Sequence, residues 1–428
     1  MDVDVIVLGL GPGGEDVAGR LAEAGLRVAG VEANLVGGEC PYWGCIPSKM
    51  MIHEAAKPDA SWERVARRIR DEATDNWDDK VAADRFTGKG GILVRGRGRI
   101  TGPRTVTVGE VITASRGIVI ASGSQPSVPP IDGLADTPYW TNHEAIETAT
   151  LPSSLIVLGG GAIGAELAHA FSRFGSTVTV VEAAPRLLAL EEPEAGELVA
   201  SAFGSAGIRV LTGATVSHVS YADGQFSLAG VSASQLLVAT GRRVDLAALG
   251  VGAVGLDESA RAIPTDGLMR AGDGVWALGD AVGKGAFTHM SMYHADIVVK
   301  DILGQEVQPA SYHAVPRVTF TDPEIGAVGL TEAQAREQGL SVQVALTDLA
   351  KSTRGWIAEA SGFIKLVASD GVLVGATSAG PCGGEVLSML TLAVHERVPV
   401  QRLREMIYAY PTFHRAVSAA LAELGGSA

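Results

Sequence analysis

The strongest constraint on the fold is a pattern that occurs twice: an apolar β-type run, a glycine-rich loop and a helical run. The first copy spans residues 3–24 and the second residues 154–174. In both loops the glycines follow the spacing G-x-G-x-x-G. Such a loop lets backbone N–H groups at a helix start approach a pyrophosphate, so two loops predict two dinucleotide sites. The loop positions that we expect to face a cofactor are Gly9, Gly11, Gly14, Gly159, Gly161, Ile163 and Gly164.

An acidic residue completes each copy of the pattern. A second β-type run follows each helix, at residues 27–31 and 177–181, and these runs end in Glu32 and Glu182. Each glutamate lies 23 residues after the first glycine of its loop, close to the roughly 20 expected of a carboxylate that binds a ribose. One glycine fingerprint alone is weak, because tight turns also select glycine. Two complete copies predict an α/β fold with two Rossmann-like domains.

Length, charge and cysteine content limit the class of protein. The 428 residues leave room for two to four domains of roughly 100–200 residues. A net charge of −14 opposes binding to nucleic acid or anionic membranes. The acidic start lacks the basic region of a signal peptide, and no apolar run reaches the ~18 residues of a membrane span. With only three cysteines, a reducing compartment is expected. We therefore expect a cytoplasmic enzyme without nucleic-acid or membrane partners.

Changes in the residue pattern along the chain indicate three domains. We expect the first to comprise residues 1–146 and 269–307, the second residues 147–268 and the third residues 308–428. In the last of these, residues 315–320, 362–367 and 372–376 have the pattern of antiparallel strands. Residues 384–397 and 400–406 have a helical pattern. The third domain is therefore expected to be α+β.

Two of the three cysteines lie close together, at Cys40 and Cys45, after a glycine turn. Their sulfurs could meet only if the local helix is distorted, because a disulfide needs Cα atoms within about 7 Å. A metal site is one alternative, although among histidines only His53 lies within ten residues and no metal-spaced cluster occurs elsewhere. Two inert buried thiols are another. Cys382 is either a third redox thiol or a cysteine packed in a turn.

Several motifs resemble those of a known family. Residues 37–49, Gly-Gly-Glu-Cys-x4-Cys-Ile-Pro-Ser-Lys, are similar to the active-site signature of the class I pyridine nucleotide–disulfide oxidoreductases. Residues 121–123 and 239–243 resemble the family's A-T-G segment and the segment that leaves its nicotinamide domain. Residues 277–280 resemble its second FAD motif, and residues 315–324 the start of its dimerisation domain. The resemblance covers essentially the whole chain.

The resemblance implies an FAD-binding first domain, an NAD(P)-binding second domain and a C-terminal α+β dimerisation domain that forms a homodimer. It implies a redox-active Cys40–Cys45 disulfide, with Cys45 as the thiolate beside the flavin and Cys40 as the sulfur that exchanges with substrate. Lys49 and Glu166 match the family's ion pair near the flavin. The further cofactor-binding residues that it implies, beside the loop positions, Glu32, Glu182 and Lys49, are Gly38, Ser122, Gly123, Gly241, Arg242, Gly279 and Asp280.

The chain departs from the family pattern near its C-terminal end. The family's disulfide reducers carry an acid–base histidine before Pro-Thr and a glutamate that orients it. Here those positions hold Tyr410 and Arg415. A phenol is a poor base for thiols, because its ordinary pKa is ~10 rather than the ~6.5 of an imidazole. Either His414 reaches back to replace the missing base, or it is a solvated or packed histidine.

These observations predict an FAD enzyme that passes electrons from NADH, or less favourably NADPH, through the cysteine pair to a small-molecule acceptor. Glu182 favours NADH because a 2′-phosphate would meet its charge. The acceptor is a disulfide or a non-thiol such as a quinone or an oxidised metal ion. Alternatives are a metal reductase like mercuric reductase, although the C-terminal cysteine pair of that enzyme is missing from residues 421–428, and a non-catalytic redox-sensing flavoprotein.

Overall fold

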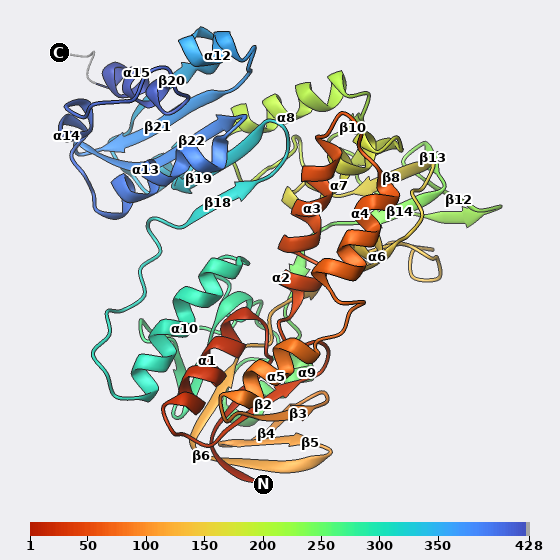
Figure 1. Ribbon diagram of the computed structural model, residues 1–428, viewed down its shortest axis with the longest axis vertical. Helices are drawn as coiled ribbons and strands as arrows, with labels where there is room; N and C mark the ends of the chain where they lie inside the picture. Colours follow the sequence, from red (N-terminus) through yellow and green to blue (C-terminus); the bar gives the residue numbers. More distant parts are fainter. Residues whose placement is uncertain (425–428) are drawn as a thin grey trace.

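The computed structural model describes residues 1–424 and shows three units (Figure 1). The last four residues of the expected third domain lie outside this range. The first unit contains an eight-stranded sheet with the order β16-β17-β6-β1-β2-β3, and the hairpin of β4 and β5 continues from β6. Its strands are β1 (Asp2–Leu8), β2 (Val28–Glu32), β3 (Ile92–Arg95), β4 (Arg99–Gly102), β5 (Thr105–Val108), β6 (Glu110–Ile120), β16 (Arg270–Gly272) and β17 (Val275–Ala277).

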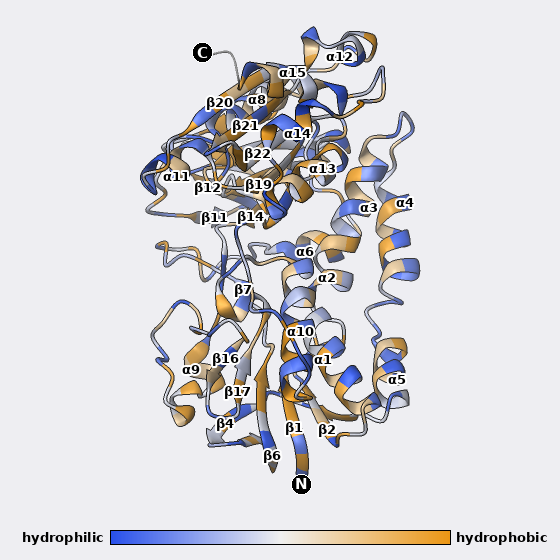
Figure 2. Ribbon diagram, turned by 90° about the vertical axis from the view of Figure 1, so that its left-hand side faces the viewer, coloured by the Kyte–Doolittle hydropathy of each residue, from blue (hydrophilic) through white to orange (hydrophobic). Residues whose placement is uncertain are grey.

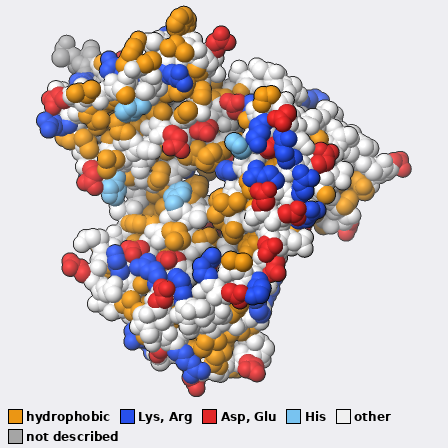
Figure 3. Space-filling view, in the orientation of Figure 1, with side chains coloured by type: hydrophobic (Ala, Val, Ile, Leu, Met, Phe, Trp, Pro, Cys, Tyr) orange, Lys and Arg blue, Asp and Glu red, His pale blue; other side chains and the backbone are white. Residues whose placement is uncertain are grey.

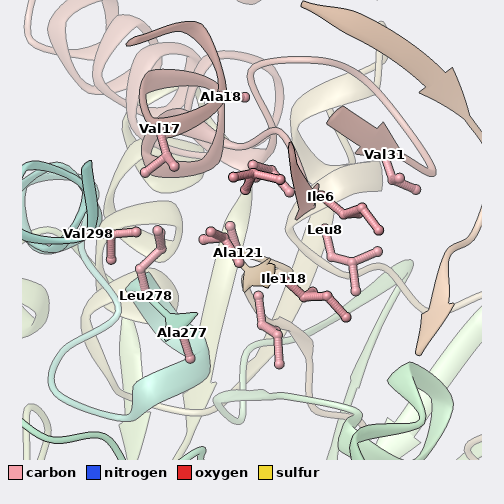
Figure 4. Close-up of a cluster of buried hydrophobic side chains, with 14 of the residues drawn as sticks. Ile6, Leu8, Val17, Ala18, Val31, Ile118, Ala121, Ala277, Leu278 and Val298 are labelled. Atoms are coloured by element: carbon pink, nitrogen blue, oxygen red, sulfur yellow. The ribbon is translucent and has the colours of Figure 1, made fainter. Parts of the chain in front are cut away.

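The central strands of this sheet are parallel and carry continuous apolar runs, as expected where both faces are covered. Figure 2 shows hydrophobic residues along β1 and β6. The helices α1 (Pro12–Glu23) and α10 (Thr288–Ile302) pack side by side, and α5 (Lys80–Gly88) contacts α1. Val17 of α1 and Val298 of α10 meet Ile6 and Ile118 of the sheet in one core (Figure 4). This core fixes the start of α1, where the first glycine loop lies.

The second unit repeats the arrangement on a smaller scale. Its parallel sheet has the order β10-β9-β8-β14, and a three-stranded antiparallel sheet, β11-β12-β13, lies beside it. The elements are β8 (Ser154–Leu158), α7 (Ala162–Arg173), β9 (Thr177–Val181), α8 (Pro193–Ser205), β10 (Arg209–Leu211), β11 (Ser220–Ala222), β12 (Gln225–Leu228), β13 (Val231–Ala233) and β14 (Gln235–Val238). The chain enters and leaves this unit through the paired strands β7 (Gln125–Pro126) and β15 (Arg242–Arg243).

Helices from the first segment of the chain pack against the second unit. They are α3 (Cys45–Ala55), α4 (Trp62–Arg68), the π-helix Ile69–Ala73 and α6 (Asn142–Glu147). Met51 and Trp62 share a core with Phe171 of α7, and the Trp62 and Phe171 ring centroids are 5.1 Å apart. The segment that follows the cysteine pair is therefore fixed between the two units.

One expected boundary differs from the packing. Residues 244–268 belong to the expected second domain, yet α9 (Leu246–Leu249), the 3-10 helix Val251–Val254 and Ile263 pack in the core of the first unit. The chain returns to the first unit directly after β15. Leu246 and Val251 are buried beside β4 there, so hydrophobic packing explains the earlier return.

The third unit is a five-stranded antiparallel sheet with the order β18-β19-β22-β21-β20, packed with helices. Its strands are β18 (Pro316–Thr319), β19 (Glu324–Gly329), β20 (Gln343–Asp348), β21 (Phe363–Ser369) and β22 (Val372–Gly380). Its helices are α11 (Glu332–Glu337), α12 (Thr353–Ile357), α13 (Gly383–His395), α14 (Val400–Arg404) and α15 (Arg415–Glu423). The predicted fold class, two Rossmann-like units followed by an α+β unit, is confirmed. Within residues 1–424 no helix is long and apolar enough to cross a membrane.

Candidate active site

The two glycine loops have matching geometries. Gly9 has φ +92°, and a Cβ there would lie 2.4 Å from the Ala121 carbonyl oxygen. A Cβ on Gly14 would lie 2.0 Å from the Gly9 oxygen, and one on Gly164 would lie 2.0 Å from the Gly159 oxygen. By contrast, a Cβ on Gly161 would meet nothing within 4 Å. The outer glycines therefore permit the tight turn and close helix packing, while the middle one leaves the loop open to a ligand.

The two strand-ending glutamates also occupy equivalent positions. Glu32 accepts hydrogen bonds from the Leu10 N–H at 2.7 Å and the Asn34 N–H at 2.8 Å. Glu182 accepts from the Gly160 N–H at 2.5 Å and the Ala184 N–H at 2.6 Å. Each carboxylate thus connects the end of the second strand to the glycine loop. A carboxylate held there keeps acceptor capacity for a ribose hydroxyl.

A cavity of about 1340 Å³ begins at the first glycine loop and extends to the start of α7. Figure 3 shows the surface hollowed between the first unit and the other two. The predicted site residues that line the cavity are Gly9, Gly11, Gly14, Glu32, Gly38, Cys40, Cys45, Lys49, Ser122, Gly123, Ile163, Glu166, Arg242, Gly279 and Asp280. Gly159, Gly161, Gly164, Glu182 and Gly241 are not among its lining residues.

This cavity fits the FAD that the resemblance implies. Its volume is large enough for a dinucleotide, and it is open at Gly11, where an added Cβ would meet only the Gly38 Cα, at 4.0 Å. The Ser122 hydroxyl at its wall is buried and has no hydrogen-bond partner within residues 1–424. A bound polar group would supply the missing hydrogen bond. Gly11, Glu32, Ser122 and Asp280 would hold such a ligand.

The cysteine pair lies at a break between two helices. The short helix α2 (Glu39–Tyr42) ends before Gly44, and Cys45 is the first residue of α3. This is the distortion that the five-residue spacing requires. The two cysteines are free thiols in the structure, and the Cys40 thiol is hydrogen-bonded to Cys45. The predicted disulfide is their oxidised form and stays a prediction.

The two thiols differ in acidity. The hydrogen bond from the Cys40 thiol lowers the pKa of Cys45 to about 5, against the opposing effect of burial. The Thr288 hydroxyl, 3.5 Å from the Cys45 sulfur, and the positive charge of Lys49 lower it further. The same hydrogen bond and burial raise the pKa of Cys40 well above its ordinary value. At neutral pH Cys45 is therefore the thiolate and Cys40 the protonated thiol.

The Lys49–Glu166 ion pair lies beside the thiols. Lys49 extends from α3 and places its Nζ 2.7 Å from Glu166 Oε2 on α7. The other Glu166 oxygen accepts the Phe320 backbone N–H at 2.8 Å, and the Lys49 Nζ lies 4.7 Å from the centre of the Phe320 ring. The pair therefore joins residues from all three units at the cavity wall.

Sequence reasoning missed several polar residues of the site. Thr288 contacts Cys45, and the Ser124 hydroxyl donates to Asp280 at 2.5 Å while accepting from Arg242 at 2.8 Å. Glu39 precedes Cys40 and lies 2.5 Å from the Nε2 of His143. Position within the Cys40 motif was the only signal for Glu39. His143, Thr288 and Ser124 carry no local pattern that marks them.

Two predicted residues lie away from the cavity in the single chain. Tyr410 is 68% exposed, and its hydroxyl donates to Thr353 Oγ1 at 3.2 Å. His414 Nε2 lies 3.1 Å from the Met389 sulfur, and its ring contacts that of Tyr408. Neither residue lines the cavity. Within one chain, His414 is packed in the third unit, and neither Tyr410 nor His414 is brought to the thiols.

Comparisons with known proteins agree with this geometry. Residues 3–295 match the family model described as pyridine nucleotide-disulphide oxidoreductase, and residues 315–421 match the dimerisation domain of the same family. A mercuric reductase from Acidithiobacillus ferrooxidans is 33% identical over 96% of this chain and 80% of its own length. A dihydrolipoyl dehydrogenase from Zymomonas mobilis is 31% identical over 97% and 96%.

A solved structure is similar over its whole length. It is the Cu(II) complex of RclA, an HOCl-induced flavoprotein disulfide reductase from Escherichia coli. The TM-score is 0.90 at 26% identity, and the alignment covers 99% of both chains. The fold and the site define an oxidoreductase with two dinucleotide-binding units and a dithiol. The chain belongs to the pyridine nucleotide-disulphide oxidoreductases, a family that depends on FAD and uses pyridine nucleotides.

Proposed function

We propose that this oxidoreductase takes electrons from NADH and passes them through FAD and the Cys40–Cys45 pair to a small non-thiol acceptor such as a quinone or an oxidised metal ion. The observation that carries the proposal is the acidic Cys45 thiol beside Lys49 and Glu166, in the cavity that begins at the first glycine loop. The absence of a His-Glu pair at positions 410 and 415 favours a non-thiol acceptor over a disulfide.

FAD held by Gly11, Glu32, Ser122 and Asp280 would supply the chemistry that converts a hydride from NADH into two electrons for the cysteine pair. Side chains of the protein then control where the protons and the negative charge go. Two electrons break the Cys40–Cys45 bond; Cys40 takes up one proton and Cys45 stays a thiolate, as their opposite pKa shifts favour. Lys49 stabilises the thiolate charge, and Glu166 holds Lys49 in place. Transfer of two electrons re-forms the S–S bond. A quinone takes both electrons with the Cys40 proton and one proton from solvent, whereas ferric iron takes one electron per ion, so two ions are reduced and the Cys40 proton leaves to solvent.

An acceptor panel under anaerobic conditions tests this function. The holoenzyme, reduced with NADH, is mixed with a benzoquinone, a naphthoquinone, ferric citrate, lipoamide and glutathione disulfide, and its reoxidation is followed by flavin absorbance. The proposal requires a quinone or the iron salt to reoxidise it at least about tenfold faster than either disulfide. Faster reoxidation by a disulfide would contradict it. Failure of NADH to reduce the flavin would instead favour the redox-sensing alternative.

A metal reductase is the second candidate, and the 33% identity to a mercuric reductase favours it. Within residues 1–424 no group of three His, Cys, Asp or Glu side chains could hold a resident metal ion. With mercuric chloride added to the same panel, reoxidation by mercuric ion faster than by any quinone or by the iron salt would favour this candidate over the leading one.

We predict a preference for NADH over NADPH of at least tenfold in kcat/KM. A 2′-phosphate would meet the charge of Glu182. The guanidinium of Arg186, four residues after Glu182, is occupied: it donates to the carbonyls of Leu188, Ala189 and Glu191 at 2.7–2.9 Å. Steady-state kinetics with both nucleotides measure the ratio of kcat/KM for NADH to that for NADPH, and Glu182→Gln should lower this ratio. A wild-type enzyme that prefers NADPH would contradict the assignment.

We predict a homodimer held by the third unit. Large apolar side chains are exposed there, including Trp356 at 75% and Ile407 at 98%, and such patches mark protein interfaces. Light scattering should give twice the 44.1 kDa mass of the chain. Ile407→Glu should shift the mass towards the monomer, while the control Val81→Glu, at an exposed site on α5, should not. A fully active monomer would exclude the idea.

A further inference from the structure

A polar cluster beside Cys40 has no part in the steps above. Glu39 is the first residue of α2 and directly precedes Cys40. One oxygen of its carboxylate lies 2.5 Å from His143 Nε2, and the other accepts the Asn142 side-chain amide at 3.2 Å. Both partners are at the start of α6, on the segment that leads into the second unit. Glu39 therefore connects the cysteine segment to the entry into that unit.

The same carboxylate also faces the exit from the second unit. Arg242, in β15, lies 3.4 Å from Glu39 Oε2 and donates to the Ser124 hydroxyl at 2.8 Å and the Ser124 carbonyl at 2.6 Å. Ser124 in turn donates to Asp280 at 2.5 Å. The segments by which the chain enters and leaves the second unit therefore both lie against Glu39, the residue before Cys40.

The other end of α2 is held by the same segment. The Trp43 ring stacks on His143, with centroids 4.4 Å apart and planes at 2°. Asn142 donates to the Trp43 carbonyl at 2.9 Å, and the Trp43 indole N–H donates to Glu147 at 2.6 Å. Residues on either side of Cys40 are therefore fixed to α6, and α6 packs in the core of the second unit.

We propose that Glu39 is a positioning residue for the dithiol. Through His143, Asn142 and Arg242, Glu39 holds α2 against the two segments that connect the nucleotide units, and so keeps Cys40 in contact with Cys45. The inference rests on the proposed function, because it concerns the same cysteine pair. Only an ionised carboxylate can accept from both His143 and Asn142 while attracting the Arg242 guanidinium 3.4 Å away; a glutamine would turn an N–H₂ group towards one of these donors. Burial opposes ionisation of Glu39, but the His143 hydrogen bond and the Arg242 charge outweigh it and keep its pKa low.

The direction of one pKa change separates positioning from a simple charge effect. The acidity of Cys45 depends first on the hydrogen bond that Cys40 donates. If Glu39→Gln loosens α2, that bond weakens and the pKa of Cys45 rises. If Glu39 acted only through its negative charge, its loss would lower the pKa of a nearby thiol. The titratable or charged side chains that face the dithiol and its segment, Lys49, Glu166, His143 and Arg242, are all still present in Glu39→Gln.

The experiment is a pH profile of iodoacetamide alkylation in the reduced holoenzyme, with Cys45 measured by peptide mass spectrometry. We expect Glu39→Gln to raise the Cys45 midpoint by at least about one pH unit. His143→Phe, which keeps the stack on Trp43 but removes the bond to Glu39, should raise it in the same direction. The midpoint of the double variant should differ little from that of Glu39→Gln, because both substitutions remove the same Glu39–His143 interaction.

A matched control comes from another His–carboxylate pair. His218 Nδ1 and Asp132 are 2.9 Å apart but exposed and away from the cavity lining, so Asp132→Asn should leave the Cys45 midpoint unchanged. A lowered or unchanged midpoint in both Glu39→Gln and His143→Phe would overturn the inference, even if the melting temperature falls. The alkylation profile needs no flavin signal, so failure of the NADH-dependent acceptor assay would count against the proposed function and not against this role of Glu39.

Discussion

Replacing Cys45 with serine should abolish the long-wavelength absorption of the two-electron-reduced holoenzyme and lower acceptor turnover by a factor of at least about 10³. That absorption needs a thiolate in contact with the flavin. Cys45 is the acidic thiol of the pair, beside the positive charge of Lys49. A serine hydroxyl does not ionise near neutrality and cannot form a disulfide, so both the absorption and the relay are lost. Anaerobic NADH titration followed by spectrophotometry measures the band.

Two control variants sharpen this test. Cys40→Ser should keep a thiolate band, because Cys45 remains, while turnover still falls. Cys382→Ser should change neither, since that exposed residue precedes α13 and does not line the cavity. Persistence of the band in Cys45→Ser would reverse the roles of the two cysteines.

The same assignment fixes the pH dependence of the band. A pKa of about 5 lies below the ordinary value of 9.0 for Cys45, so the thiolate is present above pH 5 and is protonated as the pH falls through it. We expect the absorption of the reduced wild type to be full at pH 7 and to titrate away near pH 5. A midpoint at the ordinary thiol value would show that Cys40 and Cys45 are not coupled as described.

The parts of the site that the sequence predicted are those with local chemistry. The glycine loops follow from chain sterics: Gly14 and Gly164 leave no room for a Cβ at 2.0 Å from a carbonyl oxygen. Glu32 and Glu182 follow from their position at strand ends. Each of these features depends on fewer than about 25 consecutive residues, so a pattern in the sequence marks it.

The parts that it did not predict depend on contacts between distant segments. Thr288 and Ser124 are common residue types, and only tertiary packing brings Thr288 to Cys45, 243 positions away. The Lys49–Glu166 pair was suggested by family resemblance, since 117 residues separate its members. The return of Leu246 and Val251 to the first unit has a similar origin, because an apolar residue does not specify which of two adjacent cores will bury it.

The second large effect concerns Tyr410, on which the choice of acceptor depends. If a partner subunit brings this residue to Cys40, it supplies a hydroxyl where thiol exchange needs a base that titrates near neutrality. The difference between an ordinary phenol and an imidazole, about 3.5 pH units, corresponds to about 4.8 kcal/mol. We therefore expect slow turnover of lipoamide and glutathione disulfide by the wild type, and faster NADH oxidation with quinones.

Restoring the missing pair tests this directly. Tyr410→His combined with Arg415→Glu should raise disulfide turnover at least about tenfold, while quinone turnover changes less than about twofold. Tyr410→Phe serves as the matched control and should leave quinone turnover unchanged, because its ring keeps the shape and loses only the bond to Thr353. Steady-state kinetics of the wild type and both variants with lipoamide and with a benzoquinone measure these rates. If the wild type already reduces lipoamide at about 10²–10³ per second, the argument fails, and the base would have to be His414 of a partner subunit, which lies four residues from Tyr410 in the same segment.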